Sequence, residues 1–82
     1  MWIISSSENS QNVSEIDKIL QQNVGKDLFI RLKNHTTVHG KLKNFDQHLN
    51  LILKEGNITS DEGDEKFQET LLRGSNIVMI AI

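Results

Sequence analysis

Two short polar segments carry the side chains in this sequence that could do chemistry. The first is residues 45–50 (FDQHLN) and the second is residues 72–76 (LRGSN). Each joins two apolar runs typical of strands, so each is expected at a turn that exposes its side chains. Together they supply an aromatic ring, a carboxamide and a guanidinium. Those three groups are what a protein needs to grip an unstacked nucleobase.

Chain length and composition limit how such a site can be supported. A chain of 82 residues buries only about 60% of the surface that it exposes when unfolded. It has no cysteine and therefore no disulfide, and its histidines lack the spacing of a structural zinc site. His35 and His39 have no third ligand nearby, so we expect neither a metal nor a cofactor. Packing and oligomerisation remain as the sources of additional stability.

Charge and hydropathy exclude several classes of protein. The net charge is −2 and the pI about 5.8, which does not suit a polycationic nucleic-acid binder. Basic residues nevertheless outnumber acidic ones over residues 26–54, and acidic residues dominate residues 55–69. No apolar run approaches the roughly 20 residues that span a bilayer, and no signal peptide is visible. We expect a cytoplasmic protein, with which the absence of cysteine agrees.

The first part of the chain reads as a tail followed by a short helix. Residues 1–13 are polar and rich in serine and asparagine, and we expect a flexible tail, in which Trp2 is unusual. The ordered domain is expected over residues 14–82. Ser14 can cap a helix whose apolar face is formed by Ile16, Ile19 and Leu20, and Gly25 is a plausible end.

From Asp27 the period of the apolar residues changes to two, which indicates strands. Leu28, Ile30 and Leu32 alternate with polar or exposed positions. In the next strand Phe45 is out of phase with Val38 and Leu42, which predicts a bulge near residues 43–44. Gly40 would ease the curvature of this strand. The five expected strands are residues 27–33, 38–45, 48–54, 66–72 and 77–82, with a polar, acidic loop at residues 55–65.

The last expected strand indicates self-association. Residues 77–82 (IVMIAI) are apolar at every position, so both faces should be buried, and neither charge nor proline protects the edge. Burial against a neighbouring subunit would remove this hazard. We therefore predict an obligate oligomer assembled by strand pairing, built on a mostly β fold in which one helix joins a small, strongly bent barrel.

The sequence resembles a known family over residues 14–82. Residues 38–51 (VHGKLKNFDQHLNL) and 72–78 (LRGSNIV) are similar to the two motifs of the Sm and Sm-like (LSm) RNA-binding proteins, particularly the archaeal ones. The resemblance implies a helix on a five-stranded, SH3-like antiparallel barrel. It also implies a ring of seven, or sometimes six, subunits that binds U-rich single-stranded RNA around a pore. Such rings serve RNA processing or ribonucleoprotein assembly.

Mapped onto the two motifs, the site residues take distinct roles. His48 would stack on a base and Arg73 would cover its other face. Asn50 would match the N3–H and a carbonyl of uracil, whereas cytosine has no N3–H. Asp46 would orient Asn50 through a hydrogen bond to its amide or to the loop backbone. The remaining two residues would allow close approach of the backbone and add a contact: Gly74 and Ser75.

Other interpretations stay open. Asn50 and Asp46 also suit an ordinary turn, and Arg73-Gly74 a hairpin corner. The main alternative is an SH3-like barrel that assembles with protein partners and leaves the base pocket unused. An oligonucleotide-binding barrel for single-stranded DNA would need more exposed aromatic residues than this chain has. No nucleophile–base pair or phosphate loop indicates an enzyme. We expect the acidic loop to project away from the base-binding segments.

Overall fold

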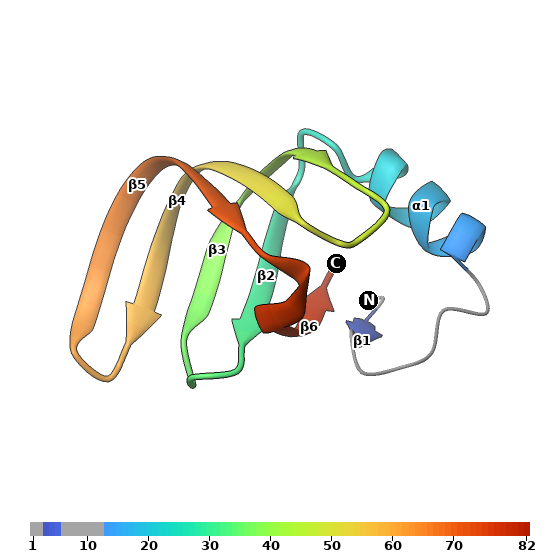
Figure 1. The fold of residues 1–82 in the computed structure, drawn as a ribbon. Coiled ribbons are helices and arrows are strands. Elements are labelled where there is room, and N and C mark those ends of the chain that lie inside the picture. Colours follow the sequence, from blue (N-terminus) through green and yellow to red (C-terminus); the bar gives the residue numbers. More distant parts are fainter. Residues whose placement is uncertain (1–2, 6–12) are drawn as a thin grey trace.

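The computed structural model describes residues 3–5 and 13–82, in which one helix lies beside a single curved antiparallel sheet (Figure 1). The predicted helix and five-stranded bent barrel are confirmed, and a short additional strand precedes them. Trp2 lies outside the described residues, as does most of the predicted tail. In chain order the elements are β1 (Ile3–Ser5), α1 (Val13–Gln22), β2 (Asp27–Leu32), β3 (Thr37–Phe45), β4 (Leu51–Ser60), β5 (Gly63–Leu72), the 3₁₀ turn η1 (Gly74–Asn76) and β6 (Ile77–Ala81). The strand order in the sheet is β1-β6-β2-β3-β4-β5.

The core lies inside the bend of the sheet. Leu28 and Ile30 of β2 are fully buried, while the alternating residues Phe29 and Arg31 are exposed. The helix adds Leu20, which is also fully buried. The apolar faces predicted for these elements are therefore confirmed. The helix begins at Val13, so Ser14 lies within its first turn and is not the residue before it.

Strands β3 and β4 depart from regular pairing at two register shifts and at Gly56. The register of β3 against β4 shifts between Leu42 and Asn44, which confirms the bulge predicted from the phase of Phe45. A second shift falls between His39 and Lys41. A Cβ on Gly56 would collide with the backbone carbonyl oxygen of His39, so the paired strands β3 and β4 leave no room for a side chain there.

The third predicted strand and the acidic loop were placed wrongly. Strand β4 begins at Leu51, three residues later than predicted, and continues through the expected loop to Ser60. Strand β5 begins at Gly63 and pairs with β4 up to the turn at Asp61 and Glu62. Ile58, in the middle of the supposed loop, packs against the core. The apolar density of this hairpin is low because one face carries charged and polar residues, and a composition-based reading mistakes it for a loop.

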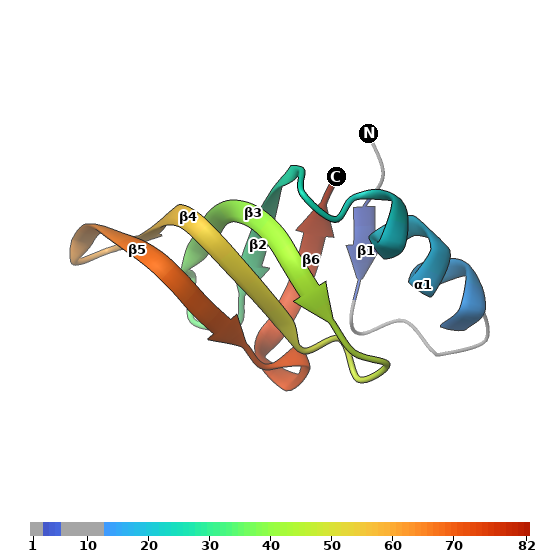
Figure 2. The ribbon, with the colours of Figure 1, turned by 90° about the horizontal axis from the view of Figure 1, so that it is seen from above.

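Strand β6 differs from its prediction at its edge, whereas the burial of both faces against a neighbouring subunit stays a prediction. Val78 remains 39% exposed, so one face of the strand is not covered within a single chain. The edge of β6 is not open either, because Ile3–Ser5 pairs with Met79–Ala81 as strand β1. Figure 2 shows β1 lying alongside β6. The first residues of the chain, expected to belong to a tail, therefore supply the backbone partner that β6 lacks.

No helix in residues 3–5 and 13–82 is long and apolar enough to cross a membrane.

We predict that Gly56→Ala destabilises the fold by about 2–3 kcal/mol, because a methyl group there overpacks the close contact between the paired strands β3 and β4. The added Cβ would lie 2.8 Å from both Gly40 Cα and Phe67 Cζ. Urea unfolding at fixed protein concentration measures the change. The control is Gln68→Ala, an exposed position on β5, which should stay within about 0.5 kcal/mol of the native protein. Equal free energies of unfolding for the two variants would contradict the close contact between Gly56 and β3.

Candidate nucleic-acid interface

Two loops meet where the strands that carry them end. Residues 46–50 connect β3 to β4, and residues 73–76 connect β5 to β6. Leu51 at the start of β4 pairs with Leu72 at the end of β5, which places the two loops side by side. We call them the 46–50 loop and the 73–76 loop. The structure thus brings together both segments that the sequence singled out.

Asp46 organises the 46–50 loop. One carboxylate oxygen, Oδ1, accepts hydrogen bonds from the backbone N–H of His48 at 2.8 Å and of Asn50 at 3.0 Å. The other, Oδ2, accepts from Asn50 Nδ2 at 2.9 Å. The backbone closes the same turn, since the Asp46 N–H donates to the Asn50 carbonyl oxygen at 3.1 Å. Asp46 therefore both shapes the turn and holds the amide of Asn50.

Asn50 links the two loops. Its Oδ1 accepts a hydrogen bond from the backbone N–H of Gly74 at 2.7 Å, while its Nδ2 donates to Asp46. Contacts at both ends of the carboxamide fix its plane and also fix which end is oxygen. One hydrogen on Nδ2 and one lone pair on Oδ1 remain for a ligand.

Gly74 is required by the packing of the two loops. A Cβ at this position would collide with the backbone carbonyl oxygen of His48 and lie 3.0 Å from the Leu49 carbonyl carbon. We expected Gly74 to allow the backbone to approach a base. The structure shows a different close approach, to the neighbouring loop, and any larger residue would push Asn50 away from the Gly74 N–H.

Leu49 carries local strain that sequence reasoning missed. Its φ is +62°, in the left-handed region that costs a residue with a side chain about 1–2 kcal/mol. Its side chain packs against the core, and its N–H donates to the Asp46 carbonyl oxygen at 3.1 Å. These contacts hold His48 and Asn50, on either side, in a tight turn. No local sequence signal marks a leucine for this conformation.

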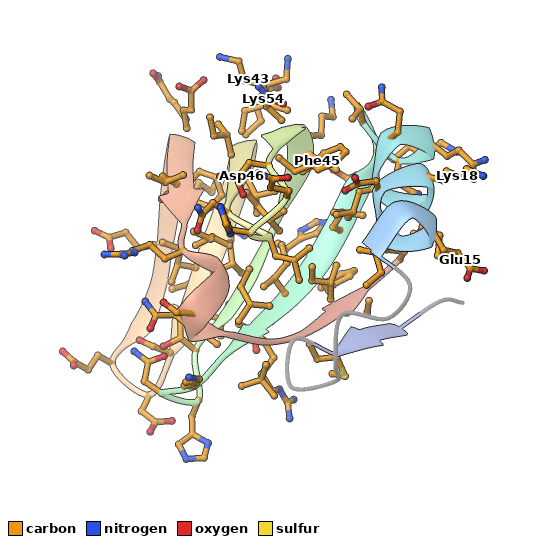
Figure 3. All side chains as sticks on the ribbon, turned by 45° about the vertical axis from the view of Figure 1, so that its right-hand side comes forward. Glu15, Lys18, Lys43, Phe45, Asp46 and Lys54 are labelled. Atoms are coloured by element: carbon orange, nitrogen blue, oxygen red, sulfur yellow. The ribbon has the colours of Figure 1, made fainter. Side chains whose placement is uncertain are left out.

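The three other predicted site residues project from the same pair of loops. His48, Arg73 and Ser75 are all exposed, which leaves their side chains free for a ligand. On its other side the 46–50 loop borders a groove of about 640 Å³ lined partly by α1. Figure 3 shows Phe45 and Asp46 on the part of the sheet that faces this helix.

The hydrogen bonds around Asp46 also change its acidity. The Asn50 side chain, together with the N–H groups of Asn50 and His48, stabilises the carboxylate and holds the pKa of Asp46 below its usual value. The carboxylate is therefore ionised throughout the neutral range. Among the described residues there is no group of three or more His, Cys, Asp or Glu side chains able to hold a metal ion.

The acidic residues of the predicted acidic loop, Asp61, Glu62, Asp64 and Glu65, lie far from this interface. They gather at the β4–β5 turn, where Ser60 pairs with Gly63, at the opposite end of the hairpin from Leu51 and Leu72. The two ends are separated by the length of β4 from Leu51 to Ser60, which is about 30 Å along the curved strand. This agrees with the expected projection away from the base-binding loops. At moderate salt, screening over about 10 Å isolates the two regions from each other.

The family follows from comparison with known proteins. The protein family described as "LSM domain" matches residues 18–82, which is most of the chain. The chain belongs to the LSM domain family. Both loops of the candidate interface lie within the matched residues.

Relatives in this family come from archaea and eukaryotes. A putative snRNP Sm-like protein of Methanosarcina acetivorans is 33% identical over 64 residues, which cover 77% of this chain and 89% of that protein. The LSM complex subunit lsm4 of Schizosaccharomyces pombe is 36% identical over 66 residues. That match covers 78% of this chain, which spans about half of the yeast protein (54%).

Solved LSM structures share the fold. A heptameric archaeal Sm protein superposes with a TM-score of 0.72 and 31% identity, covering 78% of this chain and 94% of the other. A Pyrococcus abyssi Sm protein in complex with a uridine heptamer gives a TM-score of 0.72 at 25% identity. It covers 78% of this chain and 92% of that one.

We predict that Asp46→Asn disturbs the 73–76 loop without unfolding the protein. The new amide has the same shape but would direct either a weaker acceptor or a donor at the N–H groups that the carboxylate now binds. Amide resonances of Asn50 and Gly74 should therefore shift in NMR spectra. Gln47→Ala, an exposed change in the same loop, is the control and should leave Gly74 unmoved.

The lowered pKa of Asp46 sets the pH dependence of the same contacts. Its stabilising contribution is fully present above the ordinary pKa of a free aspartate and is lost as the pH falls through the lowered value. The Gly74 amide resonance should thus stay constant from pH 8 to about pH 5 and move only in more acidic solution. A midpoint above the ordinary aspartate pKa would contradict the hydrogen-bond pattern.

Proposed function

We propose that this protein is a non-catalytic ring subunit that binds U-rich single-stranded RNA and serves RNA processing or ribonucleoprotein assembly. The observation that carries the proposal is the carboxamide of Asn50, held at one end by Asp46 and at the other by the Gly74 N–H. An amide fixed in this way can distinguish bases by their hydrogen-bonding pattern.

Uracil matches what Asn50 still offers. The base presents an N3–H donor flanked by two carbonyl acceptors, and the free lone pair of Oδ1 accepts the first while the free hydrogen of Nδ2 donates to the second. Cytosine presents an acceptor at N3, which would face the Oδ1 oxygen. Because Asp46 and Gly74 prevent the amide from flipping, Asn50 cannot adapt to cytosine at low cost.

Stacking and charge supply the rest of the affinity. His48 and Arg73 are exposed on loops whose backbones touch at Gly74. In the proposed complex the imidazole and the guanidinium lie on opposite faces of the base, each stacking contact being worth about 1–3 kcal/mol. Arg73 also neutralises a phosphate, and Ser75 adds a polar contact from the same loop. The heptameric and uridine-bound structures to which the chain is similar support this assignment.

Ring formation is proposed through β5 of one copy and β6 of the next. Strand β5 is the last strand of the sheet, and its Leu71 is 63% exposed. Val78 on β6 is likewise exposed. Pairing these strands between subunits, in a ring of seven or six, would cover both side chains. Within the single chain β1 occupies that edge of β6, so a neighbour's β5 must displace it.

The occupied edge of β6 favours a second candidate function. If β1 stays in place, the chain remains a single SH3-like barrel with an exposed apolar Leu71, suited to binding protein partners. In that case Asn50 merely fastens two loops together. The two functions differ in nucleotide binding and in oligomeric state, and both can be measured.

We predict that the protein binds labelled oligouridine more tightly than oligocytidine, as measured by fluorescence anisotropy at matched, moderate salt. Asn50→Ala should remove the preference, since the fixed donor and acceptor are lost. Gln47→Ala should retain it. Equal, weak binding of both oligonucleotides by the native protein would instead favour the protein-binding barrel.

We also predict that deleting residues 1–8 favours the ring. Removing β1 frees the edge of β6 for the β5 strand of a neighbour, so assembly should occur at a lower protein concentration than in the full chain. Sedimentation velocity across a dilution series gives the transition. A truncated chain that stays monomeric where the full chain assembles would show that β1 supports the ring instead of competing with it.

A further inference from the structure

The outer face of the sheet carries an aromatic pair that the 46–50 and 73–76 loops do not use. Phe29 of β2 and His39 of β3 are direct cross-strand partners. Their rings are stacked, with centroids 4.3 Å apart and planes 11° from parallel. Phe29 remains 54% exposed, which is high for a phenylalanine already packed against another ring.

The residues on either side leave one face of this pair accessible. On β6 the cross-strand partner of Phe29 is Ala81, whose methyl group is too small to cover the ring. Beyond His39 the same row continues across the sheet with Asn57 on β4 and Lys66 on β5. The row thus runs from a small residue through two rings to an amide and an ammonium group. Cross-strand partners share a face, so all five side chains lie on the outside of the barrel.

Cations flank the aromatic pair. Arg31 and Lys41 lie two residues along β2 and β3 on the same face, and Lys54 is the cross-strand partner of Lys41. The acids on this face are fewer, and one of them, Glu69, is bound by Lys43 at 2.7 Å. Asp27 lies opposite Lys41 on β2, and Asp64 lies in the same cross-strand row as Arg31. The three rows around Phe29 and His39 therefore carry a slight excess of cations in a chain of net charge −2, with Arg31, Lys41, Lys54 and Lys66 against Asp27, Asp64 and Glu69. Exposed rings among cations are the features by which proteins hold single-stranded nucleic acid without base specificity.

The outer face is continuous with the candidate interface. The N–H of Lys33, at the end of β2, donates to the carbonyl oxygen of Asn76 in the 73–76 loop at 3.0 Å. Phe29 lies four residues back along the same strand, or about 13 Å, with Arg31 between them. A strand of RNA leaving the loops would meet Lys33, then Arg31, then the exposed ring.

We propose that the outer face centred on Phe29 and His39 is a second binding surface for single-stranded RNA. It takes the segment of the strand that extends beyond the nucleotides held by the two loops. A base stacks on the open face of Phe29, and Arg31 and Lys41 contact the adjoining phosphates. Binding there discriminates little between bases, because it uses ring faces and charge. This inference rests on the proposed function, since it presumes that the loops hold RNA.

The test compares short and long RNA. The probes are a uridine heptamer, the type of ligand in the Pyrococcus abyssi complex, and polyuridine. Phe29→Leu keeps an apolar residue in the strand but removes the ring face. It should weaken polyuridine binding about 5- to 10-fold, the lower part of the range for one stacked base, and leave heptamer binding unchanged. Phe29→Tyr should restore polyuridine binding, and Arg31→Gln should reduce its salt slope by about one.

Controls separate this effect from folding and from the loops. Val24→Ala changes an exposed apolar residue outside the sheet and should affect neither probe. Thermal unfolding and sedimentation verify that each variant keeps its fold and its oligomeric state. If the native protein binds both probes and Phe29→Leu weakens both equally, or neither, the second surface is ruled out while the proposed function stands.

Failure of the proposed function has a different signature. A native protein that binds neither probe rules out RNA binding altogether, and this surface with it. A native protein whose polyuridine binding depends on Phe29 but not on Asn50 retains the outer surface and loses the base-specific loops.

Discussion

The hydrogen bond from the Gly74 N–H to Asn50 Oδ1, 2.7 Å long, is the contact on which the rest of the candidate site depends. It joins loops that are 24 residues apart in the chain, and it forms because β4 and β5 pair up to Leu51 and Leu72. Asp46 holds the other end of the same amide. A buried or partly buried amide satisfied at both ends is costly to reorient. The proposed selectivity for one base depends on that fixed orientation.

Two irregular features of β3 and β4 shape the part of the sheet that carries the 46–50 loop. The register shift between Leu42 and Asn44 comes just before Phe45 and the 46–50 loop, and Gly56 lets the paired strands β3 and β4 approach each other without a side chain between them. Both features are local departures from regular strand geometry. The fold therefore positions the site through its irregularities as much as through its core.

Sequence patterns were sufficient for the parts governed by periodicity. The alternation from Leu28 to Leu32 predicted a half-buried strand, and the phase of Phe45 predicted a bulge. They failed where pairing overrides composition. Residues 55–65 look like an acidic loop, yet their backbone is held in a hairpin through pairing with a neighbouring strand. Strand β1 was not predicted for the same reason, because its three residues form a strand only by pairing with β6.

The hydrogen bond between Asp46 and Asn50 was predicted from the sequence and is confirmed, the role of the site residues in binding RNA stays a prediction, and the contact between the two loops was not predicted. The residue types of His48, Asn50 and Arg73 point to a nucleobase from the sequence alone. That the Asn50 oxygen is occupied by Gly74, and that the glycine is needed for loop-to-loop contact, depends on the spatial meeting of distant segments. The left-handed Leu49 belongs with these features, since a core contact and a hydrogen bond hold it against its own preference.

The edge strands of the sheet are the elements through which we propose that subunits pair. Within the described residues, strand β5 has no strand along one of its two sides. Strand β6 pairs with β2 on one side and with only the three residues of β1 on the other. A long strand from a second copy offers more backbone hydrogen bonds than β1 does, together with cover for Leu71 and Val78. By covering the edge of β6, the short strand β1 also limits non-specific strand pairing until a second copy binds.

The proposed hydrogen bond between the uracil N3–H and Asn50 is tested most directly by changing the ligand and the protein in turn. Binding of oligouridine and of oligo(N3-methyluridine), in which the N3–H is replaced, is measured for the native protein and for Asn50→Ala. We predict that methylation weakens binding to the native protein by about tenfold or more, the value of a hydrogen bond into a fixed site. We predict little further loss in Asn50→Ala. Equal losses in both proteins would show that Asn50 does not read the base.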